Sequence, residues 1–456
     1  MRTLLKSGTV VTMNPRREIL ECADLLLEGD RIGRIIPGGS LDTGHADQLL
    51  DCTGKVIIPG LVSAHSHLTG MVQRGLWDEA TFESWSRRST ATENQLCLSP
   101  EEFYAIHCAA CIEFVRHGVT TALNMFVPRF DLSLESVRAA CRAFTDSGIR
   151  GVLALSLKDQ SPDNPGVTSR ILPSDVWQSL ARRVGEEVRR FGTRMTFMLA
   201  PSAPQRCSDQ LLGACHELAG ELRVGIHTHL AETRKHAEVG RELYGEPIVK
   251  HLERVGFLNG GLSVAHAIWL DEAEIDLLRQ HGVKVVHNPG SNMKLGSGIA
   301  RIKKMLRQGV TVGLGADSVN AGTVYSIFEQ MKLSVLLPRA AMAPEDWVFP
   351  EEALEMGTLG GAKALLLERA IGSIEEGKKA DLVVLSPSMC LRPMNDLVPQ
   401  LALCENGESV ESVFVDGNPV IMNGALMTLD EREILAMLSA LTPRIAQVRS
   451  AVAFAS

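Results

Sequence analysis

The sequence predicts an α/β protein: a (β/α)8 TIM barrel with a small β-sandwich domain built from both chain ends. Three observations support this: a length of 456 residues, an alternation of β-branched and helical segments between about residues 60 and 366, and two β-rich flanks. A chain of this length exceeds one ordinary core but suits a large barrel with an additional domain.

Eight segments are expected to form the barrel strands, because each is short and rich in β-branched residues and precedes a turn or a helix. In chain order they are Val56–Ile58, Gly118–Asn124, Arg150–Ser156, Met195–Pro201, Val224–His229, Leu262–His266, Lys284–Asn288 and Thr311–Asp317. Segments between them have the 3.6-residue period of helices, as in Glu272–His281 with its acidic first turn.

The two flanks contain short strands and turns instead. Ala380–Leu385 and Val410–Val415 are expected strands, and Asp416 with Gly417 is a typical hairpin turn. Chain ends that pair in space make the barrel an insertion between them. The predicted division is therefore a discontinuous β-sandwich domain (1–58 and 367–425), a catalytic barrel (59–366) and a C-terminal helix (426–456).

Composition excludes several classes of protein. The net charge of −8 predicts no nucleic-acid partner, and no apolar run reaches the roughly 18 residues of a membrane span. The first eight residues become polar too early for a signal peptide. Among ten cysteines only Cys108 and Cys111 form a CxxC, inside the expected helix Glu101–His117, so reduced thiols in a cytoplasmic protein are expected.

Residues with metal-binding chemistry stand at the carboxyl ends of expected strands, where barrel enzymes build their sites. His65 and His67 lie two positions apart, and in an extended chain such residues point the same way, so both rings can bind one metal ion. His227 and His229 repeat the pattern, and Glu232 follows three residues later. A glutamate beside a metal site, but not binding the ion, suits a proton shuttle.

Two more strand ends carry His266 and Asp317. An aspartate after a Gly-rich apolar strand is by itself as easily a helix N-cap. Four separate strand ends that each finish in His or Asp favour a metal-dependent hydrolase over that structural alternative. The histidines without such companions are expected on the surface or in packing: His45, His107, His117, His216, His236, His251 and His281.

These motifs resemble the amidohydrolase superfamily, in its cytosine deaminase, S-adenosylhomocysteine deaminase and triazine chlorohydrolase branch. The resemblance rests on PGLVSAHSHL (59–68), GVTTALNM (118–125), HTHLAET (227–233), VAHAIWL (264–270), VVHNPGSNMKLGSG (285–298), GLGADS (313–318) and GSIEEGKKADLVVL (372–385). It implies a distorted barrel with a sandwich made from both termini. It also implies a homodimer or larger homo-oligomer and one divalent metal ion per chain, Zn²⁺ or alternatively Fe²⁺.

The resemblance assigns roles to individual residues. The implied metal ligands are His65, His67, His229 and Asp317. Glu232 resembles the shuttle that protonates a ring nitrogen, His266 resembles the group that orients the attacked atom and the water, and Asp317 doubles as a base. The implied reaction is hydrolytic deamination of a small N-heterocycle of purine, pterin, pyrimidine or triazine type by metal-generated hydroxide. This branch uses no carboxylated lysine, and no lysine is expected at a strand end.

The segments expected to contact substrate (70–95, 156–165 and 202–207) depart from the nucleoside deaminase pattern. Glu93 is only a loose match to the ribose-binding glutamate of the family, and Ser202 replaces a histidine. Trp85 could stack on a planar substrate or pack on the rim of the barrel. Arg206 could meet a substrate carboxylate or carbonyl, or be a solvated loop residue.

Alternative interpretations of some residues and of the activity stay open. His287 and Asn288 could line the pocket or shape their loop, and His227 is expected to orient the metal site without binding the ion. The alternative activities are hydrolysis of another C–N, C–S or C–Cl bond, in a cyclic amide, a urea or a halogenated heterocycle. A non-catalytic barrel partner is disfavoured by six intact site residues. Glu232 favours deamination, because members that displace chloride or thioalkyl groups often lack it.

Overall fold

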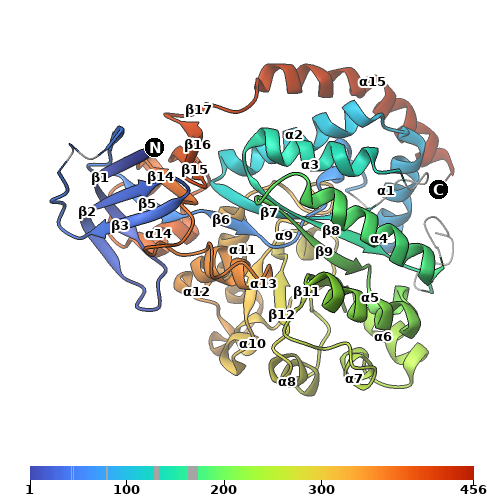
Figure 1. Cartoon of the computed structure of the whole chain (residues 1–456). Helices are drawn as coiled ribbons and strands as arrows, with labels where there is room; N and C mark the ends of the chain where they lie inside the picture. Colours follow the sequence, from blue (N-terminus) through green and yellow to red (C-terminus); the bar gives the residue numbers. More distant parts are fainter. Residues whose placement is uncertain (43, 45, 79–80, 128–132, 163–172, 456) are drawn as a thin grey trace.

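The computed structural model of the protein describes residues 1–42, 44, 46–78, 81–127, 133–162 and 173–455. An eight-stranded parallel sheet forms the centre of the molecule, with its strands adjacent in chain order (Figure 1). Its strands are β6 (Leu61–Ser63), β7 (Val119–Phe126), β8 (Arg150–Leu157), β9 (Met195–Pro201), β10 (Gly225–Leu230), β11 (Leu262–His266), β12 (Lys284–His287) and β13 (Val312–Leu314).

Backbone hydrogen bonds join the first strand region to the last. The amide of Ala64 donates to the carbonyl of Leu314 at 2.8 Å, and the amide of Asp317 donates to the carbonyl of His65 at 3.1 Å. A bridge between Ser66 and Asp317 adds to this seam. The predicted α/β barrel is therefore confirmed, and the seam lies where the chain segments that carry the candidate ligands meet.

Helices surround the barrel (Figure 1). They are α1 (Phe82–Leu96), α2 (Pro100–Arg116), α3 (Glu135–Ser147), α4 (Ser174–Arg189), α5 (Asp209–Leu222), α6 (Arg234–Tyr244), α7 (Ile248–Arg254), α8 (Glu272–Gln280), α9 (Pro289–Lys294), α10 (Ile302–Gln308), α11 (Ile327–Ala341), α12 (Pro350–Glu355), α13 (Gly361–Ala364), α14 (Leu397–Leu403) and α15 (Glu431–Ala455). Local sequence explains their starts: α2 begins with a capping box between Ser99 and Glu102. The C-terminal helix α15 packs on α1 and α2.

A second sheet is built from both chain ends, as the sequence predicts. Its strands are β1 (Arg2–Val11), β2 (Ile19–Glu28), β3 (Arg31–Ile36), β4 (Gln48–Asp51), β5 (Val56–Pro59), β14 (Leu382–Leu385), β15 (Val410–Val415), β16 (Asn418–Met422) and β17 (Ala425–Leu426). The N- and C-terminal halves join where β5 pairs antiparallel with β14. The predicted turn between β15 and β16 has positive φ at both Asp416 (49°) and Gly417 (69°), as hairpin turns of this length require.

One expected barrel strand belongs to this terminal sheet instead. Val56–Ile58 lies in β5, between β1 and β14, and the barrel starts three residues later with Leu61–Ser63. Residues 56–63 are apolar except for the last one, because β5 and β6 are both buried, so hydrophobic pattern cannot mark the crossing between sheets. At the crossing, a Cβ on Gly60 would lie 2.0 Å from Thr120 Oγ1, so only glycine fits there.

A buried ion cluster connects the two sheets. Arg150, at the start of β8, reaches Asp381 just before β14 and Asp416 in the hairpin turn, at 3.1 Å and 2.6 Å from its Nη2. The Arg150 and Asp381 side chains are only 5% and 1% exposed. Charged groups this deep must be paired, so the cluster fixes the terminal sheet against the amino end of the barrel.

The remaining expectations from composition concern membranes and cysteines. Within the described part of the chain, no helix combines the length and apolar character needed to cross a membrane. All ten cysteines are free thiols. Cys108 and Cys111 are buried in α2 as expected, and burial raises the pKa of both thiols, that of Cys108 to about 12. They are packing residues of the core.

Candidate active site

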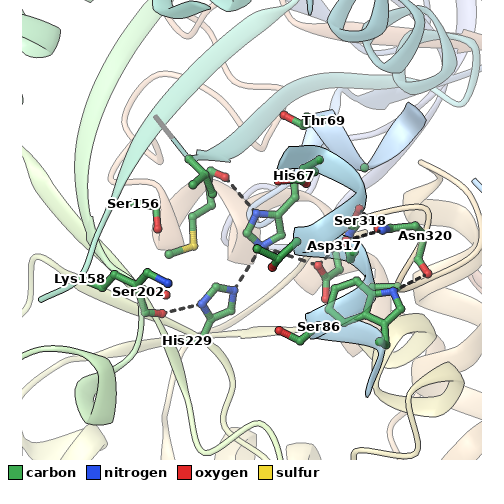
Figure 2. Close-up of a pocket in the computed structure, with 18 of the residues that line it drawn as sticks. His67, Thr69, Ser86, Ser156, Lys158, Ser202, His229, Asp317, Ser318 and Asn320 are labelled. Atoms are coloured by element: carbon green, nitrogen blue, oxygen red, sulfur yellow. Dashed lines mark hydrogen bonds and ion pairs between the residues drawn. The ribbon is translucent and has the colours of Figure 1, made fainter. Parts of the chain in front are cut away.

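A cluster of imidazole rings and one carboxylate lies at the carboxyl ends of the barrel strands. His65 and His67 follow β6, and His229 lies in β10; the Nε2 atoms of His67 and His229 are 3.2 Å apart. Asp317 follows β13, and its Oδ1 lies 3.7 Å from His65 Nε2 and 3.9 Å from His67 Nε2. Figure 2 shows His67, His229 and Asp317 directed toward one another. This histidine-rich cluster could hold a metal ion.

The outer nitrogen of each ring contacts an acceptor away from the cluster. Nδ1 of His67 donates to the carbonyl of Met125 at 2.9 Å, and Nδ1 of His229 donates to the carbonyl of Ser202 at 2.6 Å. A backbone carbonyl can only accept, so each Nδ1 carries a proton, and Nε2, which faces the cluster, is the nitrogen left to bind a metal ion. This is the tautomer that a metal-binding histidine requires.

His65 is oriented by a second histidine. Its Nδ1 lies 2.8 Å from Nε2 of His227, whose Nδ1 lies 2.8 Å from Ser263 Oγ. His65 Nε2 is buried and has no hydrogen-bond partner among the described residues. Burial, together with neighbouring rings, holds the pKa of His65 and His229 well below the usual value, so both rings are neutral. A buried, neutral and unpartnered nitrogen that faces other donors fits a metal ligand.

His266 and Glu232 stand beside this cluster. His266 Nε2 lies 3.8 Å from Glu232 Oε1 and 3.8 Å from Asp317 Oδ2, so one ring separates two carboxylates. Its Nδ1 lies 2.8 Å from Oδ1 of Asn292, which fixes the ring plane. Both His266 and Asp317 adopt positive φ, 71° and 56°, a strained backbone that often accompanies functional sites. The structure thus brings together all six predicted site residues.

Hydrogen bonds fix both oxygens of Asp317. Ser291 Oγ donates to Oδ2 at 2.5 Å, and the amide of Ser318 donates to Oδ1 at 2.7 Å. The expectations from sequence did not include Ser291 or Asn292 among the site residues. Both belong to the motif at 285–298 and follow β12, so their position at a strand end was the available signal.

A cavity of about 460 Å³ opens above the cluster. Its size lies within the usual range of small-molecule sites. The predicted substrate-contacting segments supply much of its lining: Trp85, Ser86, Ser89, Thr90, Glu93 and Asn94 of α1, then Ser156, Lys158, Ser161, Ser202 and Arg206. Trp85 also donates from Nε1 to the carbonyl of Asn320 at 3.2 Å. His287 and Asn288 are buried and are not among the described lining residues, which agrees with a role in shaping their loop.

One expectation about this cavity is wrong. Lys158 stands directly after β8, although no lysine was expected at a strand end. The strand continues through Leu157, one residue beyond the predicted end. Residues two apart on a strand face the same side, so Ser156 and Lys158 both line the cavity. Residues 163–165 of the predicted lining, and His45, lie outside the described residues.

Comparisons with known proteins agree with this geometry. The family model described as "Amidohydrolase family" matches residues 56–420. The chain is 31% identical over 448 residues to a 5-methylthioadenosine/S-adenosylhomocysteine deaminase of Bacillus cytotoxicus, an alignment that covers 95% of this chain and 97% of that protein.

Two solved structures with bound zinc are also similar to the chain. An adenosine deaminase from Xanthomonas campestris has a TM-score of 0.88 at 25% identity and covers 98% of both chains. An atrazine chlorohydrolase from Arthrobacter aurescens TC1 has a TM-score of 0.88 at 25% identity and covers 96% of this chain and 99% of that one. The match of the family model over most of the sequence, together with the relative that is 31% identical over 95% of the chain, shows that this chain belongs to the amidohydrolase family.

Proposed function

We propose that this protein is a metal-dependent hydrolytic deaminase of an N-heterocycle that carries an exocyclic amine, of purine, pterin, pyrimidine or triazine type. One observation carries the proposal: Glu232 Oε1 stands 3.8 Å from His266 Nε2, which stands 3.8 Å from Asp317 Oδ2. Two carboxylates therefore flank the reaction site from different strands. Deamination needs two such groups, one to protonate a ring nitrogen and one to move a proton from water to the leaving amine.

One divalent ion, Zn²⁺, fits the cluster. The proposed ligands are His65, His67, His229 and Asp317. Three imidazole nitrogens and one carboxylate oxygen are donors that Zn²⁺ accepts, and similar structures contain zinc. When bound, such an ion lowers the pKa of a water molecule to about 7 and so supplies hydroxide at neutral pH.

The side chains then divide the proton transfers. Asp317 accepts the proton that water loses, and Glu232 donates its proton to the ring nitrogen next to the attacked carbon. The C–O bond forms as the ring C=N bond opens. Asp317 returns its proton to the amine, the C–N bond breaks, and ammonia leaves. As the carbonyl forms, the new hydroxyl loses its proton to Glu232, which regains the proton that it donated. His266 Nε2 orients the attacking oxygen, and Trp85 and Arg206 contact the substrate from the cavity walls.

Variants at Glu232 and His229 test these roles. Glu232→Gln keeps the shape but cannot deliver the proton, so ammonia release from a panel of amino-heterocycles should fall by roughly 10²- to 10⁴-fold with the metal content unchanged. His229→Ala should lose both metal and activity. Glu238→Gln, an exposed change on α6, is the matched control.

The same assay separates the proposal from its alternatives. Undiminished turnover in Glu232→Gln would contradict the shuttle, and full metal occupancy in His229→Ala would contradict the ligand. Release of chloride or cleavage of amides without ammonia from any member of the panel would favour hydrolysis of a different bond. Carefully prepared protein without any transition metal would favour a non-catalytic role.

A further inference from the structure

One wall of the cavity carries two cations. Lys158 extends from the end of β8, and Figure 2 shows its side chain directed toward Ser202 and His229. Arg206 lies in the short turn that follows β9 (Pro204–Arg206) and lines the same cavity. The protein as a whole has a net charge of −8, so two cations on one inner wall do not simply follow from a basic composition.

The backbone that carries Lys158 is held in place. The carbonyl of Lys158 accepts a hydrogen bond from Trp177 Nε1 at 2.6 Å, and Trp177 is only 1% exposed. Strands β8 and β9 stay paired up to Leu157 and Pro201. Lys158 is therefore anchored at its base by a buried tryptophan, and its long side chain extends from a fixed point.

The same wall connects directly to the candidate metal site. Ser202 donates its amide to the carbonyl of Leu157 at 2.7 Å, and its own carbonyl accepts from His229 Nδ1 at 2.6 Å. Ser156 and Ser202 line the same cavity as Lys158. A group bound between these serines and Lys158 would therefore lie near His229, a proposed ligand.

Arg206 is placed by a second set of backbone contacts. Its carbonyl accepts from the amides of Asp159 and Gln160 at 3.3 and 3.2 Å, which joins the turn after β9 to the turn after β8. Its side chain and that of His229 line the same cavity, so it can act on groups bound there. Both cations thus belong to one rigid corner formed by the ends of β8 and β9.

We propose that this corner, Lys158 with Ser202 and Arg206, binds an anionic oxygen of the substrate. The substrate would then be an aminated heterocycle that also carries an acidic ring oxygen or a carboxylate. The inference rests on the proposed deaminase function and narrows its substrate class. Ammonium and guanidinium groups bind such oxygens through charge-assisted hydrogen bonds, with serine hydroxyls as additional donors. Glu93 and Glu232 lie elsewhere on the lining, so the positive corner gives the substrate a defined orientation.

Matched pairs of compounds test the two sources of the oxygen. Pterin and pterin-6-carboxylate differ by a carboxylate, and adenine and isoguanine differ by a ring oxygen. The kcat/KM for ammonia release is measured for both pairs with the unmodified enzyme, Lys158→Met, Lys158→Arg and Arg206→Met. Lys250→Met, an exposed change on α7, is the matched control. Binding of the deaminated products is measured separately by calorimetry, because it does not depend on turnover.

Replacing Lys158 should lower kcat/KM selectively, for the compounds that carry the additional carboxylate or ring oxygen. Lys158→Met should lower kcat/KM by roughly 10- to 100-fold for pterin-6-carboxylate, for isoguanine or for both. The change for the matched compound, pterin or adenine, should be less than about threefold. Lys158→Arg should restore most of the preference, and Arg206→Met should reduce it less than Lys158→Met does. The pair that responds identifies the source of the oxygen.

The other outcomes separate the anion-binding inference from the deaminase proposal. Equal losses for both members of each pair, or no loss beyond that of Lys250→Met, overturn the inference and leave the deaminase proposal intact. If no compound releases ammonia, yet product binding weakens selectively in Lys158→Met, the deaminase proposal fails and the anion-binding corner stands. Absence of both turnover and Lys158-dependent binding overturns both.

Discussion

Replacing Ser291 by alanine should impair catalysis without disturbing the fold. The Ser291 hydroxyl donates to Asp317 Oδ2 at 2.5 Å, with both residues almost fully buried at 1% and 5% exposed. Removing a hydrogen bond to a charged group costs about 1.5–3 kcal/mol. At about 1.36 kcal/mol per tenfold, kcat should fall by roughly 10- to 150-fold. The Ser318 amide still holds Oδ1 at 2.7 Å, so Asp317 should stay near the cluster and metal content should change little.

The assay compares ammonia release, the split between kcat and KM, and metal content by mass spectrometry. Ser297→Ala is the matched control, because Ser297 is also buried after α9 but its Oγ has no hydrogen-bond partner among the described residues. The expected result is a loss in kcat with KM nearly unchanged, since the proposed role of Asp317 is to transfer protons and not to bind the heterocycle. If Ser291→Ala loses no more activity than Ser297→Ala, the reasoning that both oxygens of Asp317 must be held is refuted.

Two further predictions concern stability. Burial lowers the pKa of His107 to about 4 from an unfolded value near 6.5, so the contribution of the neutral ring to the unfolding free energy is complete above pH 6.5 and is lost as pH falls toward 4. His107→Leu should remove about 3 kcal/mol of this pH dependence. A pH profile of unfolding like that of the exposed control His216→Leu, with the pH dependence unchanged, would contradict the prediction. Asp381→Asn weakens the buried ion pair with Arg150 and should lower the unfolding free energy, measured by urea titration, by about 3 kcal/mol. The surface variant Asp276→Asn is the control. If the urea midpoint of Asp381→Asn changes no more than that of the control, the stabilising role of the cluster is refuted.

The structure brings the proposed ligands together, as the sequence predicts, for a physical reason. His65, His67 and His229 follow from the two-residue period of extended chain and from the rule that strand ends converge at one face of a barrel. His227, which contacts His65, was expected to orient the site. The groups that orient His67 and His229 could not be predicted, because the carbonyls of Met125 and Ser202 are backbone atoms without a sequence signature. Their partners depend on strand register, which only the folded structure defines.

Two predictions from the sequence are wrong, one about where a strand ends and one about the sheet to which a strand belongs. A strand end placed at Ser156 instead of Leu157 hid the fact that Lys158 faces the cavity, because neighbouring side chains on a strand point to opposite sides. Val56–Ile58 was assigned to the wrong sheet because both sheets bury the same kind of side chain there. Hydrophobic pattern predicts that a segment is buried, and long-range pairing decides where.

The seam of the barrel has a consequence for synthesis of the protein. The bonds from Ala64 to Leu314 and from Asp317 to His65 connect residues about 250 positions apart. A nascent chain that has emerged only through residue 310 contains His65, His67 and His229 but neither closing partner. Closure of a loop of that length carries a large entropic cost before its contacts form, so these bonds cannot assist the early steps of folding. If the four proposed ligands bind an ion, that site is complete only once the last strand has docked against the first.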